Sequence, residues 1–231
     1  MSMIRRSLRV FLSLALCLPL LVSCASSTTA SVPAGCDQAG SPCLQGKATV
    51  QLTTSKGVIT LELDGDAAPV TAGNFLDLVK RGTYNGTVFH RVVRDPVPFV
   101  VQGGDPASSD PSTPKSQYGT GSFVDPSTGQ ARFVPLELAF KGEDQPRYGR
   151  VVSNPTELLQ LKLSHERGAL AMARSQAPDS ASAQFYIALK PLPELDGRYS
   201  VFGRVSEGLD VVDAIRQDDT IKKAKVLTPG L

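Results

Sequence analysis

The chain has 231 residues, of which 41% are hydrophobic and 20% charged, and its formal net charge is +2. That length suits one sizeable domain, and that composition is typical of a globular protein rather than a collagen, a coiled coil or a disordered chain. No cluster of Lys or Arg offers a surface that could follow a phosphate backbone, so nucleic acid is not an expected partner.

The first 23 residues have the pattern of an export signal. They open with a positive head made by Arg5, Arg6 and Arg9. The apolar run 10–22 that follows is long enough for the core of a signal peptide. It is too short for the roughly 30 Å hydrocarbon core of a bilayer, which needs about 20 apolar residues. These arginines are the only charged residues of the segment, so its removal changes the formal net charge from +2 to −1.

The segment 1–23 closes with Leu-Val-Ser followed by Cys24, which resembles a bacterial lipobox. The resemblance implies cleavage before Cys24 and attachment of lipid to that cysteine. The protein would then be exported and held on the extracytoplasmic side of a membrane, in the cell envelope or periplasm. An ordinary secretory signal with a chance cysteine is the alternative.

Residues 24–47 are rich in Ser, Thr, Ala, Gly and Pro, which predicts a flexible tether. The tether contains Cys36 and Cys43, a pair that can form a disulfide outside the cytoplasm; two free thiols are the alternative. A metal site would need two more ligands near this pair, which the sequence does not offer, and the histidines His90 and His165 are isolated. We therefore expect neither a metal site nor a cofactor.

A folded domain is expected over residues 48–231. Two β-like runs, 48–54 and 58–64, are separated by Ser-Lys-Gly, which predicts a hairpin. Pro69 and Thr71 then begin a helix whose buried stripe ends before Gly82. Further short β-like runs stand at 87–93, 99–102, 135–139, 169–174, 185–189, 200–205 and 221–227.

A second helix is expected at 207–217, and two long polar stretches, 106–132 and 141–166, interrupt the pattern. The second stretch has room for a short helix at 156–163. Loops of this length are uncommon unless they are functional. Many short strands separated by Gly-rich turns predict a mainly β protein with a closed sheet.

Five sequence blocks carry a sharper signal. They are Phe-His-Arg-Val-Val at 89–93, Phe-Val-Val-Gln-Gly-Gly-Asp at 99–105, Gly-Ala-Leu-Ala-Met-Ala at 168–173, Ser-Ala-Gln-Phe-Tyr-Ile at 182–187 and Leu-Asp-Gly-Arg-Tyr-Ser-Val-Phe-Gly at 195–203. In this order and spacing they resemble the cyclophilin family of peptidyl-prolyl cis-trans isomerases, over roughly residues 48 to 227. The resemblance implies a closed eight-stranded antiparallel barrel capped by two helices, and rotation about Xaa-Pro bonds as the activity.

This reaction makes and breaks no covalent bond, so it needs no nucleophile, general base or metal. It needs a fixed donor for a twisted amide, and a guanidinium is always charged and offers several donors. The resemblance assigns this role to Arg91, with Gln102 orienting it and Phe99 completing the catalytic set. The implied substrate-binding residues are Val100, Ala173, Arg174, Gln184, Phe185, Tyr186, Leu195 and Tyr199. Taken singly, Phe99, Phe185 and Leu195 also fit a hydrophobic core.

His90 precedes Arg91, and alternation along a strand turns it to the opposite face. We therefore expect His90 to be structural and hydrogen-bonded inside the protein. The chain departs from the family pattern in the longer interval 94–98, at Val100, where methionine is common, and at two further positions that bear on binding. Glu194 stands where the family has a tryptophan linked to cyclosporin binding, which predicts weak cyclosporin sensitivity. Arg174 replaces a more usual asparagine, which could favour acidic residues before proline.

The leading hypothesis is a monomeric isomerase that acts on proline-containing polypeptides and assists the folding of exported proteins. A non-catalytic module that binds proline-bearing segments, as a chaperone or scaffold, is the second hypothesis. A ligand-carrying barrel lipoprotein of lipocalin type is the third. It accounts for the strands and the membrane anchor but not for the ordered sequence blocks.

Overall fold

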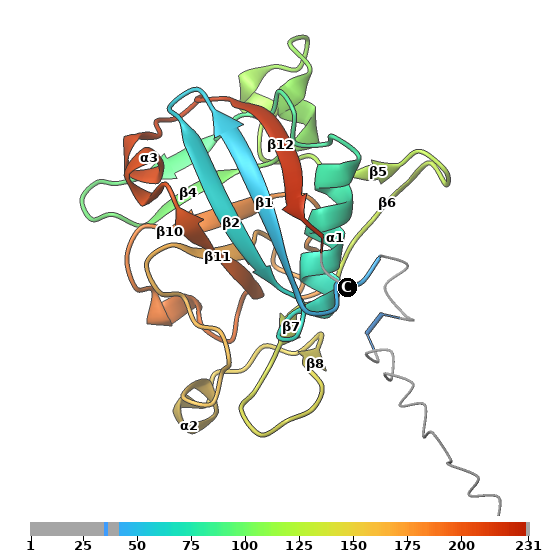
Figure 1. Ribbon diagram of the computed structural model, residues 1–231, viewed down its shortest axis with the longest axis vertical. Coiled ribbons are helices and arrows are strands. Elements are labelled where there is room, and N and C mark those ends of the chain that lie inside the picture. Colours follow the sequence, from blue (N-terminus) through green and yellow to red (C-terminus); the bar gives the residue numbers. More distant parts are fainter. Residues whose placement is uncertain (1–34, 37–41, 230–231) are drawn as a thin grey trace, which may run out of the picture. The chain divides into compact units, whose positions relative to one another are not determined.

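A computed structural model describes residues 35–36 and 42–229 of the chain (Figure 1). The predicted signal segment 1–23 and the predicted lipidation site Cys24 lie outside the described residues. Part of the predicted tether is packed against the domain. Leu44 is buried, and its backbone N–H donates to the carbonyl of Pro69 at 3.0 Å. The folded part of the chain therefore begins before Ala48.

Eight of the strands form one antiparallel sheet in the order β12-β1-β2-β11-β9-β10-β4-β3, and the other four pair as β5-β6 and β7-β8. The strands are β1 (Lys47–Thr54), β2 (Val58–Asp64), β3 (Arg91–Val93), β4 (Val100–Gly103), β5 (Val124–Asp125), β6 (Gln130–Ala131), β7 (Glu137–Leu138), β8 (Arg147–Tyr148), β9 (Ala169–Met172), β10 (Phe185–Ala188), β11 (Val201–Glu207) and β12 (Ile221–Thr228). The predicted mainly β architecture is confirmed.

The helices are α1 (Pro69–Lys80), α2 (Pro155–Leu158) and α3 (Leu209–Ala214), with 3₁₀ turns η1 (Pro106–Ser109), η2 (Lys115–Gln117) and η3 (Pro193–Leu195). In Figure 1, α1 and α3 lie on opposite sides of the group formed by β1, β2 and β12. The carboxylate of Glu137 accepts hydrogen bonds from the N–H groups of Val70 and Thr71, at 3.1 and 2.8 Å. It thus satisfies two backbone donors that the first turn of α1 leaves unpaired.

The sheet curves into a barrel but does not close, so the prediction of a closed barrel was wrong. β3 and β12 are its two edge strands. The segment 86–89 before β3 meets residues 218–221, which include the first residue of β12. The contacts are an isolated bridge between Val88 and Thr220 and backbone bonds such as Phe89 N–H to the carbonyl of Asp219 at 2.9 Å and Ile221 N–H to the carbonyl of Thr87 at 2.8 Å. β3 spans only 91–93, and Asp218 has a φ of 68°, so neither segment continues as a paired strand.

Aromatic side chains fill the barrel interior. The ring of Phe185 stands edge-on to Phe75, Tyr84 and Phe89, with centroids 5.3, 5.5 and 6.5 Å apart. Gly104 passes directly over this group, since a Cβ there would lie 2.8 Å from the Phe185 ring, and its φ of 81° favours glycine. The second glycine of the Gly-Gly pair is therefore required by the packing of the core.

The polar stretch 141–166 has a small hydrophobic core of its own, formed with β7. Its buried members are Leu136, Leu138, Phe140, Val152 and Leu161. The stretch is joined to the turn after η3, because Val152 N–H donates to the carbonyl of Gly197 at 3.0 Å. It is thus a packed extension of the barrel rather than a loose loop.

Candidate active site

The register of the sheet brings predicted site residues from separate strands into one row. Gln102 of β4 is paired with Arg91 of β3 on one side and with Tyr186 of β10 on the other. Side chains that are directly opposite in neighbouring strands share a face of the sheet. The row Arg91-Gln102-Tyr186 therefore lies on one face, and that face is the outer one, because the alternate residues Val101 and Phe185 belong to the barrel core.

A cavity of about 250 Å³ lies on this outer face. Nine of the eleven predicted catalytic and substrate-binding residues line it: Arg91, Phe99, Val100, Gln102, Ala173, Arg174, Tyr186, Leu195 and Tyr199. Its apolar base belongs to a hydrophobic cluster separate from the barrel interior. The size and the apolar base suit a small ring such as that of proline, with polar groups at the rim for a peptide backbone.

Arg91 lies at the polar side of the cavity and is exposed. Its Nη1 donates to Oε1 of Gln102 at 3.3 Å, and its guanidinium carbon lies 5.8 Å from the centre of the Phe99 ring. Gln102 Nε2 donates in turn to Oε1 of Gln184 at 3.3 Å, and Gln184 Nε2 donates to the carbonyl of Gly121 at 2.9 Å. A chain of amides therefore runs from the guanidinium to the loop at 119–121.

Asp105 fixes the far end of this chain. It is fully buried, and its carboxylate accepts hydrogen bonds from Gly119 N–H at 2.6 Å and Gly121 N–H at 3.2 Å. In the sequence, Asp105 stands only as the last residue of the block 99–105. Its role was not predictable there, because it acts on backbone groups 14 and 16 residues further along the chain.

Gln184 lines a second cavity rather than the first. This cavity, of about 300 Å³, shares Gln102, Ala173 and Arg174 with the first, and its wall includes the loop 119–122, Phe133 and several serines. Gln184 still contacts the site through its bond to Gln102. Its predicted place near the substrate remains a prediction.

The prediction for Phe185 was wrong. Phe185 was predicted to form a wall of the substrate pocket, but its side chain is fully buried in the barrel interior. The reason is the alternation of the strand, since consecutive residues of β10 point to opposite faces and Tyr186 already occupies the outer one. Of the two aromatic neighbours, only Tyr186 can contact a peptide in the cavity.

Arg174 lines the same cavity as Arg91. It donates to the carbonyls of Arg198 and Ser175, both at 2.8 Å, and its guanidinium carbon lies 4.7 Å from the centre of the Tyr199 ring. These contacts join the segment after β9 to the turn that carries Tyr199. Arg174 therefore shapes the pocket as well as adding a positive charge.

The prediction of a hydrogen-bonded His90 was also wrong. His90 is partly buried beside Arg91, but neither of its ring nitrogens has a hydrogen-bond partner among the described residues, whereas a hydrogen-bonded histidine was predicted. Burial lowers the pKa of His90, so the ring stays uncharged at neutral pH. It does not line the cavity beside Arg91.

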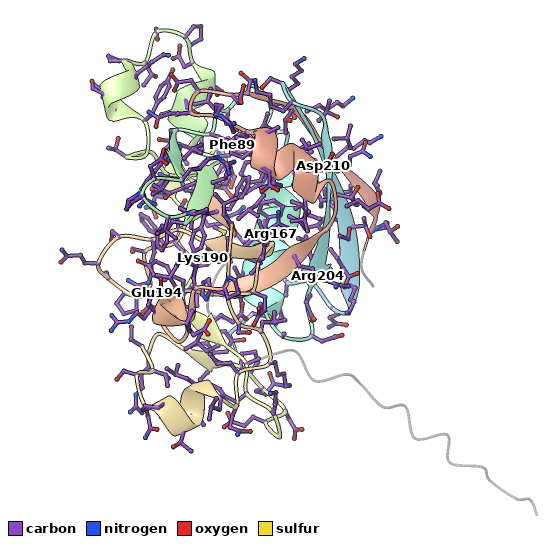
Figure 2. The ribbon with its side chains drawn as sticks, turned by 90° about the vertical axis from the view of Figure 1, so that its left-hand side faces the viewer. Phe89, Arg167, Lys190, Glu194, Arg204 and Asp210 are labelled. Carbon is purple, nitrogen blue, oxygen red and sulfur yellow. A yellow bond between two sulfur atoms is a disulfide. The ribbon has the colours of Figure 1, made fainter. Side chains whose placement is uncertain are left out.

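Glu194, the residue at the tryptophan position of the family pattern, is exposed in η3 next to the pocket residue Leu195 (Figure 2). Within the part of the chain that the structure describes, no three His, Cys, Asp or Glu side chains gather as metal ligands would. Nor does any helix in that part reach the length and apolar character needed to cross a bilayer.

Cys36 and Cys43 are joined by a disulfide, with their Cα atoms 5.8 Å apart.

An apolar pocket beside a held guanidinium, on the outer face of an open eight-stranded barrel, defines a class of peptide-binding barrel suited to proline. Comparison with known proteins identifies the family. The family model described as cyclophilin type peptidyl-prolyl cis-trans isomerase/CLD matches residues 49–230. The chain belongs to the cyclophilin family of peptidyl-prolyl cis-trans isomerases.

Individual relatives support the same family assignment. A thylakoid lumen peptidyl-prolyl cis-trans isomerase of Synechocystis is 40% identical over 197 residues, which cover 81% of this chain and 48% of that protein. The chain thus spans about half the length of this relative. Peptidyl-prolyl cis-trans isomerase-like 1 of the mouse is 36% identical over 184 residues, which cover 77% of this chain and 89% of that protein.

Solved structures agree in fold. A cyclophilin type peptidyl-prolyl cis-trans isomerase of Cryptosporidium parvum superposes with a TM-score of 0.57 at 23% identity, covering 79% of this chain and 98% of that one. The same protein has been solved in the presence of the dipeptide Ala-Pro, with a TM-score of 0.57 at 24% identity, covering 78% of this chain and 99% of that one.

Proposed function

We propose that this cyclophilin isomerises Xaa-Pro bonds of exported proteins, with Arg91 as the residue that stabilises the twisted amide. The observation that carries the proposal is the position of the Arg91 guanidinium on the wall of the apolar cavity formed by Phe99, Tyr186 and Leu195. A proline ring in the cavity would have its amide bond beside the guanidinium.

The barrier to be lowered is about 20 kcal/mol, and uncatalysed rotation takes tens of seconds. Twisting the bond ends the conjugation of the prolyl nitrogen, which becomes pyramidal and able to accept a hydrogen bond. Arg91 supplies a permanently charged donor for this nitrogen or for the neighbouring carbonyl. A donor that is already in place binds the transition state more strongly than the ground state, because charge develops there. One such donor typically lowers the activation free energy by about 3–4 kcal/mol.

The remaining roles follow from position. Gln102 orients Arg91 with its amide oxygen and donates with its amide nitrogen to Gln184. Val100, Tyr186, Leu195 and Tyr199 enclose the ring, and Phe99 closes the side nearest to Arg91. Ala173 and Arg174, shared by both cavities, line the path of the residue before proline.

We also propose that the protein acts outside the cytoplasm, anchored by lipid at Cys24 and as a monomer. The Arg-led apolar segment and the lipobox support export. The Cys36–Cys43 disulfide supports it too, because disulfides persist in oxidising compartments. Two relatives carry names that place them in the thylakoid lumen and the chloroplast.

The test of the activity is the rate of isomerisation of a short Xaa-Pro peptide, measured with the wild type and with Arg91→Ala. The variant should lose at least roughly a hundredfold in kcat/KM, since each 1.36 kcal/mol is about tenfold. Arg204→Ala is a matched control, because Arg204 is an exposed arginine of β11 that does not line either cavity. A wild type that binds the peptide without accelerating the isomerisation would instead support the non-catalytic binding module.

The test of the anchor is expression of the full chain in a bacterial host with a labelled fatty acid. Label should enter the wild type and be absent from Cys24→Ser, and the membrane fraction should contain only the former. A mature N-terminus at a residue other than Cys24 would overturn the lipid anchor and leave an ordinary secretory signal.

A further inference from the structure

A buried chain of side-chain hydrogen bonds lies behind the proline pocket. Nδ1 of His165 lies 2.7 Å from Oδ1 of Asp196, and its Nε2 lies 2.9 Å from the hydroxyl of Tyr186. The side chain of His165 is 0% exposed, and Tyr186 is 4% exposed. His165 does not line the cavity, so it can reach a substrate only through Tyr186.

The chemistry of the three groups sets the direction of the bonds. An ionised carboxylate only accepts, so Asp196 places a proton on Nδ1 of His165. In the Nδ1–H tautomer Nε2 is an acceptor, and the Tyr186 hydroxyl donates to it. Burial raises the pKa of Tyr186 well above its ordinary value, so this hydroxyl keeps its proton. Asp196 also accepts the backbone N–H of His165 at 2.9 Å.

These bonds join parts of the pocket that come from different elements. Tyr186 belongs to β10, whereas Asp196 lies in the turn after η3, between the pocket residues Leu195 and Tyr199. The Tyr186 and Tyr199 rings stand edge-on with their centroids 5.8 Å apart. The His165 carbonyl further accepts the N–H of Leu192, just before η3, at 2.8 Å.

We propose that His165 and Asp196 are positioning residues that hold the Tyr186 ring and the turn 195–199 as preformed walls of the proline pocket. The bond to His165 directs the phenolic hydroxyl away from the pocket, so the ring carbons are left to contact proline. A wall that is ordered before binding spares the substrate the cost of ordering it. The two residues therefore act on KM and leave kcat, which depends on Arg91, nearly unchanged.

A purely structural role makes a different prediction. In that case the loss of His165 would lower the free energy of unfolding, but folded molecules would bind the substrate as before. The two roles are separated by the ratio of the effects on KM and kcat in folded protein. The inference rests on the proposed isomerase activity, so the binding of the peptide is measured as well as its turnover.

The experiment compares His165→Leu, Tyr186→Phe and the double variant, with a short Xaa-Pro peptide as the probe. His165→Leu leaves the Tyr186 hydroxyl buried without an acceptor, and KM and Kd should rise roughly tenfold with kcat within about twofold. In the double variant the hydroxyl and the imidazole are both gone, while Asp196 keeps the backbone N–H of residue 165. KM should then return to within roughly threefold of the wild type, because no buried hydroxyl is left without an acceptor. Arg204→Ala again serves as the unchanged control.

An unchanged KM and Kd in folded His165→Leu would overturn the inference, and so would a double variant as impaired as the product of the two single effects. If His165→Leu does not fold, Asp196→Ala and Tyr186→Phe carry the same test, since each removes one bond of the chain. A wild type that binds the peptide but does not turn it over would refute the proposed activity alone. The Kd series would then still decide the positioning role.

Discussion

Consecutive residues of β4 and β10 lie in two different environments. Val101 and Phe185 point into the barrel, where they are fully buried among aromatic and aliphatic side chains. Their neighbours Gln102 and Tyr186 point outward and line the cavity beside Arg91. The inner face determines whether the chain folds, and the outer face determines what the folded chain does. Changes one residue apart should therefore have effects of different kinds.

The largest effect on stability is expected from Phe185→Ala on the inner face. Removing a fully buried phenylalanine typically costs about 3–5 kcal/mol of the free energy of unfolding, from lost burial and the cavity that remains. Urea unfolding measures this cost. Phe133→Ala is the matched control, because Phe133 is 47% exposed and should cost under about 1 kcal/mol. A small cost for Phe185→Ala together with a raised KM would mean that Phe185 belongs to the pocket after all.

The next effect is on activity and comes from the outer face. Gln102→Ala removes the acceptor for Arg91 Nη1 and breaks the link to Gln184. The loss of this orientation should lower kcat/KM roughly tenfold, while the free energy of unfolding changes by less than about 1 kcal/mol. Gln130→Ala, at an exposed glutamine of β6, should change neither quantity. A variant with full activity would show that Arg91 is held in place without Gln102.

The two faces also explain how much the sequence could predict. The ordered blocks located Arg91, Gln102, Phe99 and the turn at 195–199, because each block contributes residues that are close together in the chain. They did not separate Phe185 from Tyr186, because a block contains both faces of its strand and only the register shows which side is outward.

The hydrogen bonds behind the site could not be predicted from the sequence, because they join residues that are far apart in the chain. His165 and Asp196 are 31 residues apart, and Tyr186 is 21 residues from His165. Each is unremarkable in its own segment. The open edge of the barrel was missed because the runs 87–93 and 221–227 both have the composition of strands. The short length of β3 and the left-handed backbone of Asp218 become visible only in the structure.

A smaller effect is expected at the rim of the outer face. Glu194→Trp would supply an indole N–H and an apolar ring where a carboxylate now lies exposed. Cyclosporin should bind this variant roughly tenfold more tightly than the wild type, the gain expected of one added aromatic contact. Glu194→Gln separates the ring from the charge, since it removes only the charge. Equal cyclosporin affinity in all three proteins would mean that Glu194 does not limit binding.

The smallest effect concerns His90, the partly buried neighbour of Arg91. Burial lowers the pKa of His90 below its ordinary value of 6.5, the Asp105 carboxylate partly opposes this, and the charge of Arg91 adds to it. The unfolded chain therefore binds more protons than the folded one as the pH falls below about 6.5, and linkage makes the free energy of unfolding decrease in that window.

Urea unfolding at a series of pH values from about 7 to 5 should show this decrease in the wild type. It should be shallower in His90→Gln, which carries no titrating ring at that position. Arg91→Ala should keep most of the decrease, because burial is the larger cause of the lowered pKa and remains when the arginine charge is gone. Identical slopes in the wild type and His90→Gln would mean that the imidazole takes up its proton as readily in the folded chain as in the unfolded one. His90 would then have the solvent contact of an outer-face residue, and the division between the two faces would not extend to the residue that precedes β3.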